Sequence, residues 1–408
     1  MTPLGVGIIG AGKIGAKRAQ AIAGSAGSRL VAIADSDVVR AAAMAYEFGV
    51  IATAGVDELI ARRDVDAVVV ATPHRWLAPV ALAALQAKKH ALVEKPLAIN
   101  ALAAEELVDA ARSAGRVLKT GFNHRCHLAV AEARALANAG RIGRLMHIRC
   151  RYGHGGRKGY ADEWRANPLE SGGGELLDQG IHALDLFRWF LGEFTEVYAA
   201  LTRAFWPMPV EDNAFCTLRT AAGQVAQLHA SWTQWKNIFS FEVFGDRGYL
   251  LVEGLGGNYG QERLVVGHRP AEFGAPEEES KLFGGADVSW AAEWAEFESA
   301  IREQREPQGS GQDGWQALRL VEAAYTSERE GRVVKLNSPT ADPETVQGEQ
   351  HEQHHDQQHG AEHDQRAEQL IVEQLIVEQR VAEQLVAEQR IRREVSGRSA
   401  GNRRAARP

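Results

Sequence analysis

Three glycines near the start of the chain have the spacing of a dinucleotide-binding turn. Gly10-Ala-Gly12-Lys-Ile-Gly15 follows an apolar run and opens a helical pattern. In such a turn Gly10 permits the tight bend, Gly12 lets the backbone approach a pyrophosphate, and Gly15 lets helix and strand pack closely. Asp35 ends the second apolar run, twenty residues after Gly15. A glycine turn with only a structural role is the alternative, but the strand, helix and carboxylate together predict a dinucleotide site.

The carboxylate of Asp35 also indicates which dinucleotide binds. It can accept hydrogen bonds from both hydroxyls of the adenosine ribose, and its charge would repel a 2′-phosphate. No arginine occurs in Ser36-Asp37, directly after it. We therefore expect NAD, with NADP disfavoured.

A lysine, an aspartate and a histidine have the chemistry to oxidise a secondary alcohol. Loss of hydride to a nicotinamide must be accompanied by loss of the hydroxyl proton, and a base that titrates near neutrality suits that task. Asp178 and His182 are four residues apart on a predicted helix and would share one face. Lys95 follows a predicted strand, where open α/β sheets bind ligands, and Pro96 restricts the turn. We assign His182 as general acid/base, Lys95 as the donor to the reacting oxygen, and Asp178 as a substrate ligand and partner of Lys95 or His182. A surface pair and an ordinary turn are the alternatives.

A cationic segment with aromatic residues, 151–165, suits a carbohydrate that carries phosphate, because arginine pairs with phosphate and tryptophan stacks on sugar rings. A solvent-exposed glycine loop is the alternative. A second aromatic segment could line the cleft from the sheet side, although core packing is the more common role of such tryptophans. The expected substrate ligands in segment 151–165 are Arg157, Trp164 and Arg165, and the second segment comprises Trp232, Gln234, Trp235 and Lys236.

The elements that must position these residues change character along the chain. Between residues 4 and 121, short apolar runs alternate with helical patterns, which predicts βαβ units and a parallel sheet. After residue 140, apolar and polar residues alternate, as in Ala226–Trp232, which predicts half-exposed antiparallel strands. The fold class is thus an α/β doubly wound domain of the Rossmann type, followed by an α+β domain.

Composition limits the function classes. The 408 residues allow two or three cores, and a formal net charge of −7 disfavours nucleic acid and acidic membrane surfaces as partners. The cysteines, Cys126, Cys150 and Cys216, lack the spacing of a metal site or a disulfide framework. We expect a cytoplasmic protein with no metal.

Beyond Leu336 the sequence becomes low in complexity. Residues 368–389 repeat a five-residue unit beginning with Glu-Gln, and the expected state of the whole tail is disorder. His351, His355, His359 and His363 recur every four residues, so a metal site there is the weaker alternative. The predicted domains are 1–122 for the cofactor, 123–336 for substrate and oligomer contacts, and 337–408 for the tail.

Two motifs resemble those of the glucose-fructose oxidoreductase/inositol dehydrogenase (Gfo/Idh/MocA) family. They are Glu94-Lys95-Pro96 and the segment from Gly172 to His182, and the resemblance covers roughly residues 4–336. It implies a second domain with a large, mostly antiparallel open sheet, through which a homodimer or homotetramer would form. The implied cofactor ligands are Gly10, Gly12, Lys13, Ile14, Gly15, Asp35, Thr72, Pro73, Glu94 and Lys95. The resemblance also places Asn123 beside the nicotinamide and the substrate, which makes Asn123 an implied substrate ligand.

The resemblance implies an NAD-dependent dehydrogenase acting on a secondary hydroxyl or keto carbon of a sugar, nucleotide sugar or cyclitol such as inositol. Two alternatives stay open. One is a catalytically silent NAD(H)-binding regulator of the same fold. The other is an enzyme that holds NAD tightly and catalyses net hydrolysis or epimerisation through a transient ketone.

Overall fold

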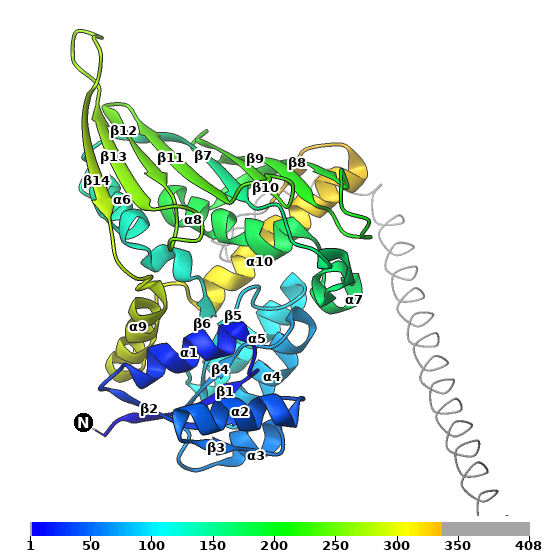
Figure 1. The fold of residues 1–408 in the computed structure, drawn as a ribbon. Coiled ribbons are helices and arrows are strands. Elements are labelled where there is room, and N and C mark those ends of the chain that lie inside the picture. Colours follow the sequence, from blue (N-terminus) through cyan, green and yellow to red (C-terminus); the bar gives the residue numbers. More distant parts are fainter. Residues whose placement is uncertain (1, 337–408) are drawn as a thin grey trace, which may run out of the picture. The chain divides into compact units, whose positions relative to one another are not determined.

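The first sheet has the predicted doubly wound topology. The structure, a computed structural model, describes residues 2–336. Six parallel strands lie in the order β3-β2-β1-β4-β5-β6 (Figure 1). Their bounds are β1 (Leu4–Ile9), β2 (Ser28–Ala34), β3 (Ile51–Ala52), β4 (Ala67–Val70), β5 (His90–Glu94) and β6 (Leu118–Gly121). The strand order reverses between β1 and β4, and ligands bind at the carboxyl ends of strands beside such a reversal.

Helices connect these strands, and their ends follow local sequence rules. Asp37 caps α2 by accepting hydrogen bonds from the backbone N–H groups of residues 39 and 40, and Gly49 ends that helix with a φ of 65°. Asn100 caps α5 in the same way. The helices are α1 (Lys13–Ala23), α2 (Val38–Phe48), α3 (Val56–Ala61), α4 (His74–Gln86) and α5 (Ala101–Ala114).

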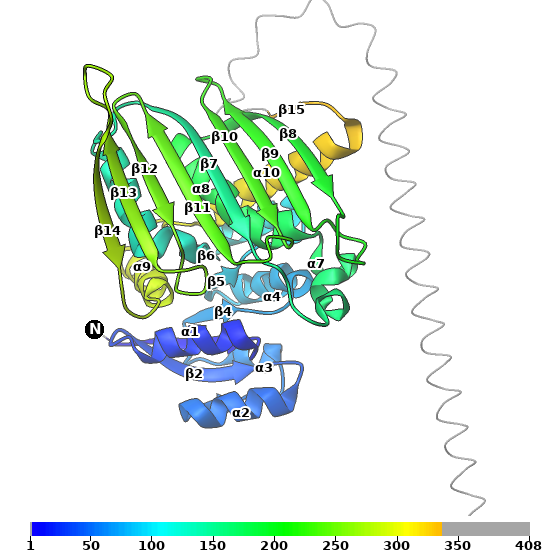
Figure 2. The same ribbon diagram turned by 45° about the horizontal axis from the view of Figure 1, so that its top comes forward.

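The second sheet is large, open and mostly antiparallel, as expected. Its nine strands lie in the order β14-β13-β12-β11-β7-β10-β9-β8-β15, and only the β10–β7 pair is parallel (Figure 2). Burial alternates along β9, because one face packs on the core and the other faces solvent. The bounds are β7 (Leu145–Gly153), β8 (Phe194–Thr202), β9 (Asn213–Thr220), β10 (Val225–Ser231), β11 (Ile238–Gly245), β12 (Gly248–Glu253), β13 (Glu262–His268), β14 (Glu277–Phe283) and β15 (Val334–Lys335).

Helices α6, α8 and α10 cover one face of this sheet, the face turned toward the first domain (Figures 1 and 2). Helix α10 packs on both β8 and α5, so it joins the two sheets. The remaining elements are η1 (Asn123–Cys126), α6 (Leu128–Asn138), η2 (Tyr160–Asp162), η3 (Trp164–Ala166), α7 (Pro168–Ser171), the π-helical turn η4 (Leu176–Gly180), α8 (Ile181–Leu191), α9 (Ser289–Glu303) and α10 (Gly311–Glu330).

Helix α9 belongs to the second half of the chain but packs on the first domain. Its Trp294 and Phe297 share a core cluster with Ile8 and Ile33 of the parallel sheet. The domain boundary predicted at residue 122 stays a prediction. The predicted disordered tail and its histidines lie outside the described residues. No helix within residues 2–336 is both long enough and apolar enough to cross a membrane.

Candidate active site

A cavity of about 970 Å³ lies at the carboxyl ends of the parallel strands and extends beneath the second sheet. Apart from Gly15 and the second aromatic segment, every predicted site residue lines it. The lining ones are Gly10, Gly12, Lys13, Ile14, Asp35, Thr72, Pro73, Glu94, Lys95, Asn123, Arg157, Trp164, Arg165, Asp178 and His182. Sequence reasoning therefore selected residues from distant parts of the chain that the fold brings together.

The glycine turn has the geometry of a phosphate cradle. Gly10 has a φ of 105°, and a Cβ there would lie 2.5 Å from the carbonyl oxygen of Ala71. A Cβ on Gly15 would lie 1.9 Å from the carbonyl oxygen of Gly10, which explains why Gly15 supports the turn from outside the cavity. Gly12 faces open space, with no atom within 4 Å of a Cβ, and no side chain caps the N-terminus of α1. The turn thus fits the pyrophosphate of a dinucleotide.

Asp35 lies beside the glycine turn, at the end of β2, and its carboxylate is paired with Arg40, a residue that the sequence analysis did not consider. Arg40, in the first turn of α2, donates to both carboxylate oxygens, with Nη2–Oδ1 at 2.7 Å and Nε–Oδ2 at 3.2 Å. The backbone N–H groups of Ala11 and Asp37 donate to Oδ2 and Oδ1. Burial raises the pKa of Asp35, but these hydrogen bonds outweigh burial and lower it. The absence of an arginine from Ser36-Asp37 is therefore no guide to the charge at Asp35, because the first turn of α2 brings Arg40 back to the carboxylate.

Glu94 has an internal partner as well as a place on the cavity wall. Arg18 is fully buried and pairs with Glu94 at 2.6 Å and with Glu293 of α9 at 2.6 Å. Because the Glu94 carboxylate is used within the protein, it supports the cofactor end of the cavity by fixing α1 against β5.

Lys95 and Asp178 form the polar centre of the substrate end. Lys95 follows β5, and its peptide bond to Pro96 is cis. Its ammonium donates to Asp178 Oδ1 at 3.0 Å and also to the Asp178 carbonyl oxygen. Arg165 Nε donates to Asp178 Oδ2 at 2.9 Å. Burial raises the pKa of Asp178, but the charges of Lys95 and Arg165 overcome burial and hold that pKa well below its usual range.

His182 is buried on α8, and its partner is another histidine. Asp178 was expected to pair with Lys95 or with His182, and in the structure it pairs with Lys95. The Nδ1 atom of His182 is buried and has no hydrogen-bond partner among residues 2–336. The expectation of a regular i, i+4 face did not include the wider π-helical turn η4, which contains Asp178 and leads directly into α8. The His182 ring stacks on that of His124, with centroids 3.7 Å apart and planes 16° apart. Burial, followed by the charge of Lys95, lowers the pKa of His182 well below its usual value.

His124 is fixed by hydrogen bonds at both ring nitrogens. Its Nε2 lies 3.0 Å from the Tyr152 hydroxyl and its Nδ1 lies 3.2 Å from Asn123 Oδ1. Asn123 Nδ2 in turn donates to Ser289 Oγ at 3.0 Å. Asn123 was predicted to bind substrate; it lines the cavity, but both ends of its amide are hydrogen-bonded within the protein.

The cationic segment 151–165 reaches the cavity, and both of its arginines there are paired with carboxylates. Arg157 makes a bidentate pair with Glu163, at 2.7 and 2.6 Å, and Arg165 pairs with Asp178. Trp164 packs its ring edge to face on His74, with centroids 4.7 Å apart. These contacts place an aromatic wall beside Asp178.

The second aromatic segment, Trp232, Gln234, Trp235 and Lys236, could have lined the cleft but does not, and Trp232 has the core role that is the more common one. Trp232 is fully buried in a separate small core with Tyr160, and Trp235 turns outward with 64% of its surface exposed. Strand β10 ends at Ser231, so these residues lie beyond the alternating pattern that suggested them.

Sequence reasoning missed several lining residues. His74 begins α4 directly after β4, and its Nε2 lies 3.6 Å from Asp178 Oδ1; its position after a parallel strand could have identified it. Burial lowers the pKa of His74 to about 3, so its ring is neutral. Tyr259 lies in a glycine-containing loop, and its hydroxyl donates to Gln179 Oε1 at 3.2 Å. Nothing local in the sequence marks Tyr259.

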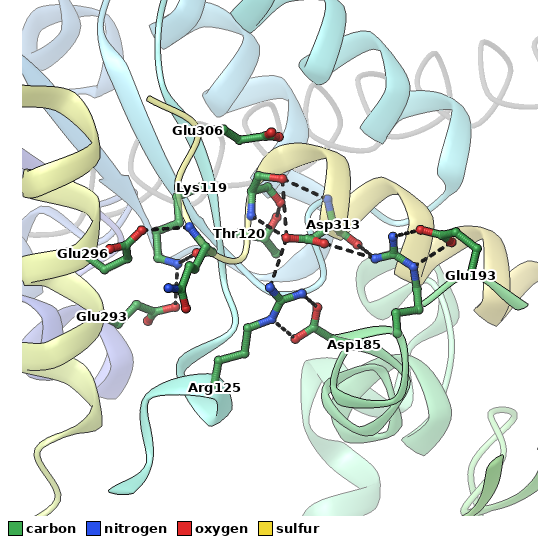
Figure 3. Close-up of polar contacts among 12 residues, drawn as sticks. Lys119, Thr120, Arg125, Asp185, Glu193, Glu293, Glu296, Glu306 and Asp313 are labelled. Atoms are coloured by element: carbon green, nitrogen blue, oxygen red, sulfur yellow. Dashed lines mark hydrogen bonds and ion pairs between the residues drawn. The ribbon is translucent and has the colours of Figure 1, made fainter. Parts of the chain in front are cut away.

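A buried ionic network holds the two histidine-bearing elements together (Figure 3). Arg125 of η1 pairs with Asp185 of α8 through two hydrogen bonds, at 2.8 and 2.5 Å, and with Asp313 of α10 at 3.2 Å. Arg125 follows His124, and Asp185 lies about one turn after His182. The network therefore fixes the distance between the stacked rings. Within residues 2–336, no group of three or more potential ligands is arranged to hold a metal ion.

A parallel sheet with an open glycine turn, joined to an enclosed lysine, aspartate and histidine, defines a dinucleotide-dependent oxidoreductase. Comparison with known families gives the same class. Residues 4–122 match the oxidoreductase family with an NAD-binding Rossmann fold, and residues 130–251 match the GFO/IDH/MocA C-terminal domain. The chain belongs to the Gfo/Idh/MocA family and is an enzyme of its dehydrogenase type.

Relatives of known activity lie at moderate distance. The chain is 32% identical over 332 residues to the 1,5-anhydro-D-fructose reductase of Ensifer adhaerens, covering 79% of this chain and 96% of the relative. It is 28% identical over 343 residues to the inositol 2-dehydrogenase of Rhizobium meliloti, covering 81% and 98%. Among solved structures, a levoglucosan dehydrogenase in complex with NADH superimposes with a TM-score of 0.76 at 26% identity, covering 83% of this chain and all of that one.

Proposed function

We propose that this enzyme transfers a hydride between the nicotinamide of NAD(H) and a secondary hydroxyl or keto carbon of a sugar, nucleotide sugar or cyclitol. The observation that carries the proposal is the single cavity in which the open Gly12 turn, Lys95, Asp178 and His182 meet. The nicotinamide, when bound, supplies the hydride acceptor or donor. Relatives acting on anhydrosugars and inositol support the substrate class.

Each residue of the chain has a task that its surroundings explain. The Asp178 carboxylate, held anionic, orients the Lys95 ammonium, and that ammonium donates a hydrogen bond to the reacting oxygen. His182 has a lowered pKa and is neutral at neutral pH, so it is able to accept the hydroxyl proton during oxidation. In the reverse direction the same groups return the proton to the oxygen, because both directions pass through one transition state.

The charges of the loop favour a neutral substrate over a phosphorylated one. Arg157 and Arg165 are both paired with carboxylates, so the loop has little uncompensated positive charge to attract a phosphate. Trp164, which is only partly buried, offers an apolar face to a sugar ring in the same region. A free sugar or cyclitol therefore fits the compensated site better than a sugar phosphate.

The test is a substrate panel of inositols, anhydrosugars, aldoses and nucleotide sugars, each with NAD(H), read at the nicotinamide absorbance. Turnover of a polyol or its ketone, lost in Lys95→Ala, supports the proposal. Tight NADH binding without turnover of any member would favour a silent regulator. A cofactor that survives dialysis and is reduced only transiently would favour the epimerase or hydrolase alternative.

A further inference from the structure

We propose that Arg40 makes the enzyme accept NADP(H) as well as NAD(H), by masking Asp35 and presenting a guanidinium to a 2′-phosphate. The inference rests on the proposed nicotinamide site and concerns its adenosine end. It begins from the hydrogen bonds around one carboxylate.

The acceptor capacity of Asp35 is already used. An ionised carboxylate has about four lone-pair sites on its two oxygens. Here Oδ2 accepts from Ala11 N at 2.6 Å and Arg40 Nε at 3.2 Å, and Oδ1 accepts from Asp37 N at 2.8 Å and Arg40 Nη2 at 2.7 Å. The two backbone donors are fixed by the turn and by α2. A ribose diol can therefore bind Asp35 only where Arg40 moves away.

Arg40 is placed to take either of two positions. Its side chain is 50% exposed and lines the cavity, whereas that of Asp35 is only 7% exposed. Because the Arg40 side of the pair is exposed, water can solvate the guanidinium when it leaves, and the ribose hydroxyls can replace its hydrogen bonds to Asp35. With Arg40 away, Asp35 receives the two ribose hydroxyls of NAD(H).

In the position that the structure describes, Arg40 prepares the site for a phosphate. The pair with Asp35 cancels the negative charge that would repel a 2′-phosphate, and the Nη1 group of the guanidinium adds donors beyond those bound to Asp35. Ser36 also lines the cavity beside Arg40, and its hydroxyl, which makes a long hydrogen bond to Asp35 Oδ1 at 3.4 Å, can rotate to donate to a phosphate instead. Asp37 is the opposing charge, but its carboxylate accepts from two backbone N–H groups of α2. Arginine presented at a ribose is the arrangement that accommodates NADP.

The experiment is a fluorescence titration of the full-length protein with NADH and with NADPH, which needs no substrate. In the wild type we expect both to bind, with dissociation constants within about tenfold of each other. Arg40→Ala removes a charged partner, so NADPH affinity should fall roughly ten- to a hundredfold. NADH affinity should stay unchanged or rise, because Asp35 regains two acceptor sites.

Arg62→Ala is the matched control, since Arg62 makes a similar two-bond pair with Asp64 on the same domain, outside the cavity. It should change neither affinity. Wild-type binding of NADH with NADPH more than a hundredfold weaker would overturn the inference and leave the proposed function intact. An equal loss of both affinities in Arg40→Ala would also overturn it. Failure of the wild type to bind either dinucleotide would instead refute the proposed function.

Discussion

The imidazole rings of His124 and His182 lie face to face, with centroids 3.7 Å apart. Two imidazolium ions cannot share so close a contact, so at most one ring of the stack carries a proton. Burial, followed by neighbouring positive groups, lowers the pKa of each. The stack therefore keeps His182 in the neutral form that a general base requires, and the partners of His124 hold the stack in place.

Lys95→Ala and His182→Ala should each reduce kcat by about 10² to 10⁴, because a positioned acid/base group contributes that much to rate. NADH affinity should change little, since the glycine turn and Asp35 are left intact. Steady-state kinetics and NADH titration measure the two effects separately. Lys281→Ala and His147→Ala, on the second sheet and outside the cavity lining, are the matched controls. Turnover within threefold of wild type in both site variants would refute the assignment.

Asp185→Asn tests the pair that fixes the stack. It removes a buried charge from Arg125 but leaves Asp313 beside the guanidinium at 3.2 Å. Breaking a buried pair typically costs about 3 to 5 kcal/mol of unfolding free energy. Because Asp313 still pairs with Arg125, we expect Asp185→Asn to lose an amount near the lower of these values. We also expect a lower kcat with unchanged NADH affinity, because the ring contact loosens. Denaturant unfolding provides the first measurement, and Asp64→Asn in an exposed pair is the control. A fully stable, fully active Asp185→Asn would show that the network does not position His182.

Local patterns explain how much of this architecture the sequence could predict. The alternation of apolar runs and helices gives the parallel sheet, because each βαβ unit encodes its own period. Strand β14 was missed because it is exposed on both faces at the sheet edge and shows no alternation. Nothing in a single strand specifies the parallel β10–β7 pairing either, since that pairing depends on how the chain crosses the sheet.

The same limit applies to the site. Lys95, Asp178 and His182 belong to motifs that are visible in the sequence. The stack of His124 on His182 joins residues 58 positions apart, and only the fold creates it. Arg40 could more nearly have been predicted, because it follows Asp35 by only five residues. Whether it reaches the carboxylate depends, however, on where α2 begins.

The pH dependence of stability should show the contribution of His90, outside the active site. Its Nδ1 accepts a hydrogen bond from Val117 N at 3.0 Å, and burial together with Arg116 lowers its pKa from 6.5 to about 4. Below pH 6.5 His90 binds a proton in the unfolded chain but not in the native protein. The stability that comes from the neutral native ring is therefore present above pH 6.5 and is lost as pH falls toward 4. Between pH 7 and 5, the free energy of unfolding of the wild type should fall by on the order of 1 kcal/mol more than that of His90→Gln. This figure allows for solvent screening of the partly exposed ring. Parallel pH profiles for the two proteins in denaturant unfolding would refute the assignment.

Asp35→Ser provides the counterpart to the Arg40 variant at the adenosine end. The change removes the bidentate acceptor for the ribose hydroxyls, and hydrogen bonds to a charged group are worth about 1.5 to 3 kcal/mol, so NADH affinity should fall roughly ten- to a hundredfold. Arg40 would lose its partner and become fully available to a 2′-phosphate, so NADPH affinity should be retained or improved. The preference between the two dinucleotides should thus shift toward NADPH in Asp35→Ser and toward NADH in Arg40→Ala. Titration of both cofactors against both variants, with Asp64→Ser as the control, measures these opposite shifts. Unchanged NADH affinity in Asp35→Ser would show that the carboxylate does not bind the ribose.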